Sequence, residues 1–197
     1  MRSDDTDNCR RCMTTPFRFR KVITLGEYEH ELRQTILRMK TDRSGFLATA
    51  LAAWLVESRW KLLDESQADV VVPMPMHRLR RWQRGVNNPD HLAEEIARRL
   101  DRPVLRNVVF RLRRTMLQFQ LSRRGRSENV EGAFAVRRER LLTGQNVLLV
   151  DDILTTGATC NAVTAVLLAA GAKSVTVCVA ARAEGSTLQQ NEPVFVK

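Results

Sequence analysis

Residues Val147–Thr159 read VLLVDDILTTGAT, and this stretch has the clearest local pattern in the sequence. It begins within the continuous apolar run Asn146–Val150, which is typical of a strand buried on both faces of a parallel sheet. Two acids, Asp151 and Asp152, follow the run, and a Thr-Thr-Gly turn comes next. This order predicts a buried strand that ends in two carboxylates and leads into a tight turn.

The residues after the turn complete a larger unit. Thr159–Ala170 predicts a helix, and Gly171 is a suitable C-terminal stop because glycine adopts the left-handed conformation common there. Ser174–Ala180, SVTVCVA, predicts another strand. Strand, loop, helix and strand of these lengths form a βαβ unit, which implies parallel pairing and a right-handed crossover. We therefore expect an α/β fold in which helices flank a twisted parallel sheet.

The turn has the properties of a phosphate site beside a sugar site. In open parallel sheets, ligands bind beyond the carboxyl ends of the strands. The start of the next helix presents free N–H groups and the positive end of its dipole, which suits a phosphate. Paired carboxylates can accept hydrogen bonds from the vicinal hydroxyls of a ribose. The expected phosphate contacts come from Thr155, Thr156, Gly157, Ala158 and Thr159, and the expected ribose contacts from Asp151 and Asp152.

The same thirteen residues have a simpler interpretation, which is an ordinary strand–turn–helix whose threonine caps the helix. Paired acids after an apolar strand also occur in metal and phosphoacceptor sites. The full pattern favours a sugar phosphate, because only that ligand needs a phosphate cradle and a diol clamp side by side.

The stretch resembles the signature of type I phosphoribosyltransferases for phosphoribosyl pyrophosphate (PRPP). That signature is an apolar strand, two acids, two variable residues and Thr-Thr-Gly-x-Thr. The resemblance implies the type I phosphoribosyltransferase fold. It also implies that Asp151 and Asp152, the candidate catalytic residues, contact the ribose hydroxyls, while Thr155–Thr159 wraps the 5-phosphate.

Other segments resemble the ComF family of competence and DNA-utilisation proteins. Val70–Asn87, VVVPMPMHRLRRWQRGVN, is similar to that family's V-P-V-P-x-H…R-G-x-N segment, and Leu32–Lys40 is similar to its early helix and lysine. Residues 111–134 resemble its R…T-x-x-Q…R-x-x-N…G-A-F stretch, through Arg111, Thr115, Gln118, Arg126, Asn129, Gly132, Ala133 and Phe134. The matched pieces follow the order of the family.

This resemblance implies two loops around PRPP. A pyrophosphate loop would use backbone N–H groups and countercharge from Met74, Pro75, Met76, His77, Arg78 and Arg84. A flexible loop would close over PRPP and exclude water from a reactive sugar cation, with Arg111, Thr115, Gln118, Arg126 and Asn129. A lone histidine such as His77 is equally consistent with a surface or core position.

The rest of the chain supplies further elements. Predicted strands are Arg18–Thr24, Asp69–Pro73 and Ala133–Val136, and Pro103–Phe110 is expected to give one or two short strands. Predicted helices are Glu27–Met39, Gly45–Glu57 and Pro89–Leu100. The expected division is 1–15 as the remnant of a zinc ribbon, 16–60 as a helical N-terminal or hood segment, and 61–197 as the phosphoribosyltransferase core. The apolar helices of 16–60 are equally consistent with plain packing.

Positive charge is confined to one stretch. Arg78–Arg140 holds seventeen arginines, no lysine and seven acids, which equals the whole net charge of +10, so the remainder is neutral. Such a stretch predicts a surface for polyanions or loops for phosphorylated ligands, and arginine favours forked phosphate contacts. About half of these arginines are expected only to solubilise helix faces.

Cys9 and Cys12 form half of a zinc site, since structural zinc takes four ligands. ComF proteins typically begin with two such pairs as a small zinc ribbon. The first pair is absent here, so either translation begins upstream of Met1 or the ribbon has decayed. Cys160 and Cys178 belong to the βαβ unit and are expected to be small core residues.

Two functions from different classes fit the sequence. One is a protein that binds PRPP or ribose 5-phosphate and acts in DNA uptake or in the use of DNA as a nutrient, with single-stranded DNA and competence machinery as partners. The other is an active PRPP-dependent glycosyltransferase of unknown acceptor. Both would use Mg²⁺ on phosphate oxygens. A chain without a long apolar run or a signal peptide is expected in the cytoplasm, with no membrane span.

Overall fold

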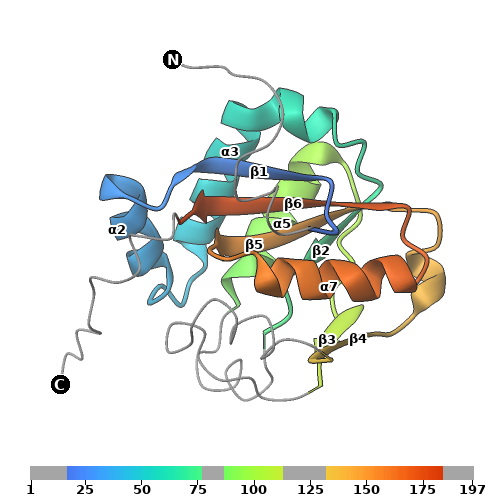
Figure 1. Cartoon of the computed structure of the whole chain (residues 1–197). Coiled ribbons are helices and arrows are strands. Elements are labelled where there is room, and N and C mark those ends of the chain that lie inside the picture. The colour runs from blue at the N-terminus through green and yellow to red at the C-terminus, as the bar shows by residue number, and fades with distance from the viewer. Residues whose placement is uncertain (1–16, 77–86, 113–131, 184–197) are drawn as a thin grey trace.

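The fold is built on one parallel sheet of four strands (Figure 1). In order across the sheet, the strands are β1 (Lys21–Glu27), β6 (Ser174–Arg182), β5 (Asn146–Leu154) and β2 (Val70–Pro73). Every neighbouring pair is parallel, so the predicted α/β fold is confirmed. The computed structural model describes residues 17–76, 87–112 and 132–183.

Helices cover both faces of the sheet because its central strands are apolar on both sides. Successive side chains of a strand point to opposite faces. Leu148 accordingly joins the core cluster under α2, α3 and α5, whereas Leu149 joins the cluster under α7. Figure 1 shows α7 in front of the sheet and α3 behind it. The helices are α2 (His30–Met39), α3 (Phe46–Asp64), α5 (Asn88–Leu100) and α7 (Ala158–Ala169).

The unit β5–α7–β6 matches the expected strand, loop, helix and strand, and Gly171 ends α7 with a φ of +92°. The predicted strand Asn146–Val150 is too short, because β5 continues to Leu154 and carries both acids within it. The extension follows from its neighbours. β2 ends opposite Val150, but β6 continues beyond that level and pairs with β5 as far as Arg182.

The N-terminal third is part of the same core. β1 pairs with β6 along the edge of the sheet, and Ile23 shares a buried cluster with Leu148. The helix predicted at Gly45–Glu57 extends to Asp64, so the expected division after residue 60 falls inside α3. The helix departs from helical geometry at Arg59, whose guanidinium donates to the β1 carbonyls of Thr24 and Leu25 at 2.8 and 2.9 Å.

A small antiparallel pair lies below α7. Strands β3 (Val109–Arg111) and β4 (Phe134–Val136) form it, and Val104 adds a single parallel bridge to Val71 of β2. Of the one or two short strands predicted at Pro103–Phe110, the structure has two separate short pieces. A 3-10 turn, η2 (Glu139–Leu141), leads from β4 toward β5.

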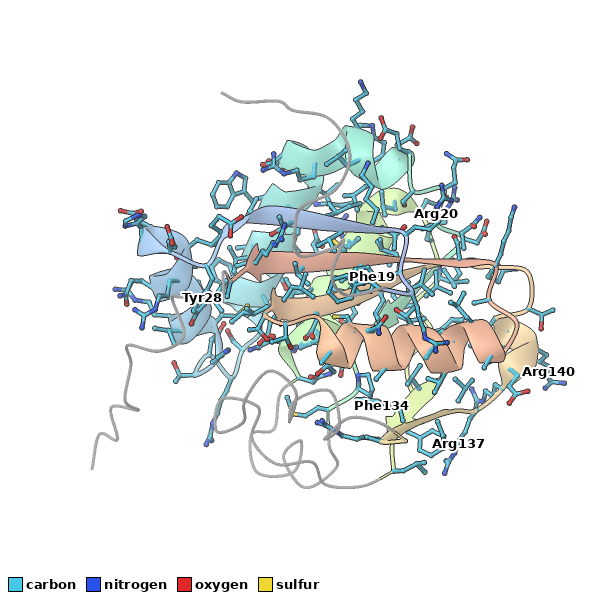
Figure 2. All side chains as sticks on the ribbon, viewed as in Figure 1. Phe19, Arg20, Tyr28, Phe134, Arg137 and Arg140 are labelled. Atoms are coloured by element: carbon cyan, nitrogen blue, oxygen red, sulfur yellow. The ribbon has the colours of Figure 1, made fainter. Side chains whose placement is uncertain are left out.

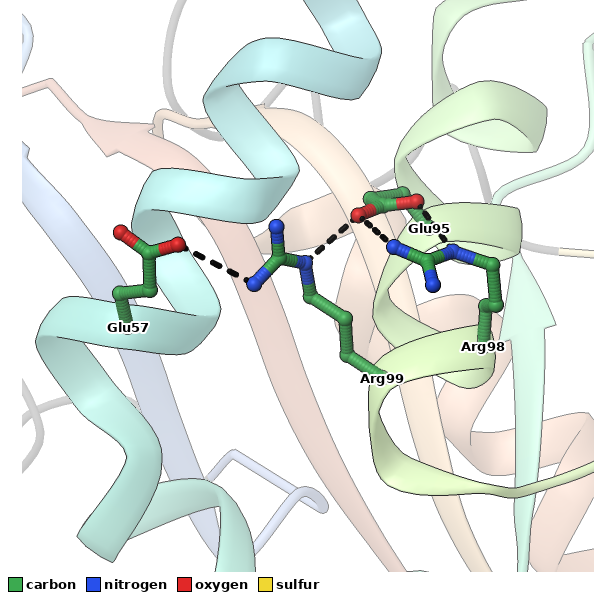
Figure 3. Close-up of polar contacts among 4 residues, drawn as sticks. All are labelled: Glu57, Glu95, Arg98 and Arg99. Atoms are coloured by element: carbon green, nitrogen blue, oxygen red, sulfur yellow. Dashed lines mark hydrogen bonds and ion pairs between the residues drawn. The ribbon is translucent and has the colours of Figure 1, made fainter.

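Several arginines of the basic stretch have structural partners on α5 (Figure 3). Arg98 and Arg99 both donate to the buried carboxylate of Glu95, at 2.7 and 2.6 Å, and Arg99 also reaches Glu57 of α3 at 3.1 Å. These contacts lower the pKa of Glu95 to about 2, chiefly through the hydrogen bond from Arg98. The network joins α5 to α3.

Nine of the seventeen arginines fall in 77–86 and 113–131, outside the described residues. In sequence these segments directly follow the ends of β2 and β3. These two segments thus hold about half of the arginines in the basic stretch. In the parts that are described, no helix has the length and apolar character needed to cross a membrane.

Candidate functional site

Two carboxylates lie near the carboxyl end of β5 and interact with different elements. Asp152 Oδ2 lies 4.0 Å from the Nζ of Lys40, which directly follows α2 on one face of the sheet. Asp151 is electrostatically coupled to Cys160, in the first turn of α7 on the other face. The backbone N–H of Asp152 donates to Asp151 Oδ1 at 2.8 Å. The pair therefore bridges the two helical layers at one edge of the sheet.

The electrostatics of the pair favour a cationic or hydrogen-bonding partner. Burial and the neighbouring Asp152 raise the pKa of Asp151 well above its ordinary value, and Lys40 only partly opposes this. Burial and both carboxylates also raise the pKa of the Cys160 thiol. Tyr28 is buried, and its pKa is raised by burial and by Asp152, with Arg33 acting in the opposite direction. In the ligand-free protein, full ionisation of both carboxyl groups is thus disfavoured where the strands end.

The turn after β5 has the geometry that the sequence predicted. Gly157 has a φ of +78°, a left-handed conformation that glycine adopts without strain, and it caps the N-terminus of α7. The hydroxyl of Thr156 accepts a 3.4 Å hydrogen bond from the N–H of Ala158. Thr155, Thr156, Ala158 and Thr159 are all partly exposed. The first turn of a twelve-residue helix therefore opens beside the two carboxylates.

The chain segment before β1 also reaches this turn. A side-chain carbon added to Gly157 would lie 2.8 Å from Cε1 of Phe17. The N–H of Arg18 donates to Asn161 Oδ1, on α7, at 2.7 Å. Figure 2 shows Phe19 in front of the sheet, on the side that α7 covers, whereas Tyr28 lies near α2. The sequence analysis matched Lys40 to a family position but missed Phe17, Tyr28 and Asn161, for which no local pattern gave a signal.

The predicted pyrophosphate loop begins at the same edge. β2 pairs with β5 so that Pro73 lies opposite Val150, and the N–H of Met74 donates to the Val150 carbonyl at 2.8 Å. Met74 is buried, and Pro75 and Met76 are partly exposed. The remaining predicted members, His77, Arg78 and Arg84, lie outside the described residues.

Only one residue of the predicted flexible loop is described. Arg111 ends β3, and its guanidinium carbon lies 5.2 Å from the centre of the Phe134 ring on β4. The other predicted members, which lie outside the described ranges, are Thr115, Gln118, Arg126 and Asn129. The structure thus shows where the predicted flexible loop begins. Its role in closing over PRPP stays a prediction.

The cysteines divide into two groups. Cys160 and Cys178 are buried, unpaired thiols, as expected for small core residues. Burial raises the pKa of Cys178 to about 12. Cys9 and Cys12, the predicted half of a zinc site, lie outside the described residues. Within the described ranges, no three His, Cys, Asp or Glu side chains come together as a metal site.

The fold class of the protein follows from its similarity to a known domain. A model of the phosphoribosyl transferase domain matches residues 91–197, which include β5, α7 and β6. The fold is therefore that of a type I phosphoribosyltransferase domain. A purine phosphoribosyltransferase from Pyrococcus horikoshii Ot3 is 15% identical and covers 90% of this chain and 100% of its own, with a TM-score of 0.41. The domain match and the parallel strand order β1-β6-β5-β2 support the assignment to the phosphoribosyltransferase class.

Two curated relatives specify the family. Competence protein F of Haemophilus influenzae is 30% identical over 89% of this chain and 79% of its own length. The DNA utilization protein YhgH of Escherichia coli K12 is 33% identical over 86% of this chain and 75% of its own length. The chain belongs to the family of these proteins, the ComF family, as its motifs indicated.

Proposed function

We propose that this protein binds PRPP or ribose 5-phosphate at the turn between β5 and α7. The observation that carries the proposal is the position of the Gly157-capped N-terminus of α7 beside Asp151 and Asp152 at one sheet edge. Helix N-terminal N–H groups suit a dianionic phosphate, and adjacent carboxylates suit a ribose diol. Because β2 ends next to β5, the Met74–Met76 segment is positioned to contact a second phosphate group on the same ligand.

The chain has donors that fit a magnesium ion carried in with PRPP. Mg²⁺ prefers hard oxygen ligands and is usually held by one or two carboxylates together with substrate phosphates and water. Asp151 and Asp152 provide such carboxylates, and they are not fully balanced by Lys40. When bound, the ion would neutralise the charge of pyrophosphate. The residues of this chain would orient the ribose and fix the 5-phosphate.

Titration of the intact protein with PRPP and with ribose 5-phosphate tests this proposal. Both ligands are expected to bind when Mg²⁺ is present. PRPP is expected to bind more tightly and to lose more affinity on chelation of the metal, because only PRPP carries pyrophosphate. Absence of binding by either ligand, with the protein folded by circular dichroism, would contradict the proposal.

The biological role that we propose follows the family. The relatives are named for competence and for DNA utilization. We infer a corresponding role for this chain in DNA uptake or in the use of DNA as a nutrient. The two arginine-rich segments 77–86 and 113–131 support contact with a polyanion.

Filter binding of single-stranded DNA over a salt series tests the contact with DNA. Affinity should fall steeply as salt increases, because phosphate contacts release counterions. It should survive Asp151→Asn, since this carboxylate serves the ribose site. Binding that is absent, or that does not depend on salt, would remove the DNA part of the proposal.

The second candidate function is catalytic. It is compatible with the paired carboxylates, which both candidate functions use to bind the ribose. Phosphoribosyl transfer breaks the bond between C1 and pyrophosphate through a cation-like sugar, so the protein would stabilise departing pyrophosphate and position the acceptor. Release of pyrophosphate from PRPP and Mg²⁺ over a panel of bases and amines is the test. Bound PRPP with no pyrophosphate released over the panel would leave the binding role.

A further inference from the structure

The four residues Phe17–Arg20, which we call the strap, directly precede β1 and contact the predicted phosphate turn and α7. The ring of Phe17 lies so close to Gly157 that a Cβ on Gly157 would be 2.8 Å from Cε1 and 3.2 Å from Cζ. A Cβ essentially never comes within 3.0 Å of a heavy atom outside its own residue and its two chain neighbours. The ring therefore occupies the space where any other side chain at position 157 would begin.

The strap is held along its whole length. The Phe17 ring stacks on Phe19 at a centroid separation of 4.8 Å, and Phe19 packs against the core under α7. The N–H of Arg18 donates to Asn161 Oδ1 at 2.7 Å. The N–H of Arg20 donates to the carbonyl of Val175, near the start of β6, at 2.8 Å. These contacts fix the position of the Phe17 ring relative to the sheet.

Gly157 is held from two directions. The Phe17 ring lies against its Cα, and its carbonyl accepts a 2.8 Å hydrogen bond from the N–H of Asn161. Asn161 in turn accepts from Arg18, so backbone and side chain of one residue connect the strap to the turn. A left-handed glycine has wide conformational freedom in the absence of such neighbours.

We propose that Phe17 is a positioning residue for the phosphate turn, which holds Gly157 and the first N–H groups of α7 in the geometry that binds the 5-phosphate. The role rests on the proposed function for its ligand. The reason is preorganisation: a loop that is already in its bound conformation loses less entropy when the ligand binds. Asn161 assists by connecting Arg18 to the Gly157 carbonyl.

Phe17→Ala is the central variant, and Phe17→Leu tests rescue by a side chain that restores part of the contact. We expect Phe17→Ala to weaken PRPP binding about tenfold, which corresponds to about 1.4 kcal/mol, and Phe17→Leu to recover most of the loss. The matched control is Phe46→Ala, because Phe46 is 71% exposed on α3 and the chemical change is identical. This control should bind PRPP as the unmodified protein does.

Hydrogen exchange of the ligand-free protein provides a second readout, which a general loss of stability would not reproduce. Phe17→Ala should speed exchange in peptides that cover residues 155–160 and leave those covering β2 unchanged. A global effect would instead raise exchange in both regions. Because no ligand is needed, this arm still decides the inference if PRPP does not bind at all, an outcome that would contradict only the proposed function.

A double-mutant cycle tests the contact itself. Gly157→Ala introduces backbone strain at a φ of +78° and also a clash with the Phe17 ring. In the Phe17→Ala background only the strain remains, so Gly157→Ala should lower Tm by about 2–4 °C less there than in the unmodified protein. Equal losses in both backgrounds, together with unchanged exchange at residues 155–160, would overturn the proposal.

Discussion

The two halves of the candidate site are assembled in different ways. The carboxylates and the phosphate turn come from nine consecutive residues, Asp151–Thr159, at the junction of β5 and α7. Their neighbours Phe17, Tyr28 and Lys40 come from the first forty residues and reach the site only through the tertiary fold. The first half is local chemistry, and the second half depends on where the chain places distant segments.

Strand order explains the difference. β6 lies between β1 and β5, so the segments that flank β1 reach the two faces of the sheet next to β5. Phe17 precedes β1 and meets the turn on the α7 side, whereas α2 follows β1 and brings Lys40 to the other side. Under the proposed function, the local half would set the kind of ligand, and the distant half would set how firmly the turn and the carboxylates are held.

The largest effect is expected from Gly157→Val, which alters the local half. A β-branched residue at a φ of +78° is strained and would also meet the Phe17 ring. We expect a loss of about 2–3 kcal/mol in the free energy of unfolding, together with loss of PRPP binding. Urea denaturation and calorimetry measure the two quantities. A matched change is Gly144→Val, at a φ of +74° with no atoms nearby, which should keep binding intact.

Lys40→Met tests the distant half. It removes the cation that lies 4.0 Å from Asp152 and keeps the length of the side chain. We expect PRPP affinity to fall about tenfold, because the carboxylates and the anionic ligand lose a shared countercharge. Lys61→Met, an exposed lysine of α3, is the control. Equal affinities of the two variants would show that Lys40 takes no part in the site.

Asp151→Asn is expected to raise stability while it weakens binding. The folded-state pKa of Asp151 lies well above its ordinary value, so its ionisation destabilises the ligand-free fold as pH rises through that range. Removing the charge should therefore add about 1 kcal/mol near neutral pH, and the gain should disappear as pH falls toward 4. Thermal melts across this pH range measure the difference, and a gain that is larger at low pH would contradict the assignment.

The smallest effect on the site should come from Glu95→Gln, because Glu95 belongs to neither half and bonds to Arg98 and Arg99. Glu95 has a pKa of about 2, so the stability it contributes is present above about pH 4.5 and declines as pH falls toward 2. The variant should lose about 1 kcal/mol at neutral pH, because a neutral amide replaces the carboxylate and keeps only one oxygen that can accept from Arg98 and Arg99. PRPP affinity should not change, and denaturation with calorimetry on one sample checks both statements.

The sequence predicted the local half because its features follow one another along the chain. The apolar run, the acids, the glycine and the helix gave the order and type of β5, α7 and β6. The end of β5 was wrong because it depends on pairing with β6, which continues to Arg182. The end of α3 was also placed too early, although its side chains after Glu57 still pack against the core.

The distant half could not be predicted in the same way. Nothing in the local pattern of β1 indicates that it pairs with β6, so the contact of Phe17 with Gly157 had no sequence signal. Lys40 was noticed only through its resemblance to a family position. Tyr28 falls in the segment predicted as the helix Glu27–Met39, but α2 begins only at His30, and Asp152 lies close enough to raise the pKa of Tyr28.

Calorimetric titration of PRPP into the double variant Asp152→Asn with Thr156→Ala is the decisive test of the β5–α7 turn as the ribose 5-phosphate site. The variant changes one carboxylate and one hydroxyl of the local half, both partly exposed, so the fold should remain intact by circular dichroism. We expect the unmodified protein to bind PRPP and the double variant to give no measurable heat of binding. Equal affinity in the two proteins would contradict the assignment of the β5–α7 turn as the ribose 5-phosphate site.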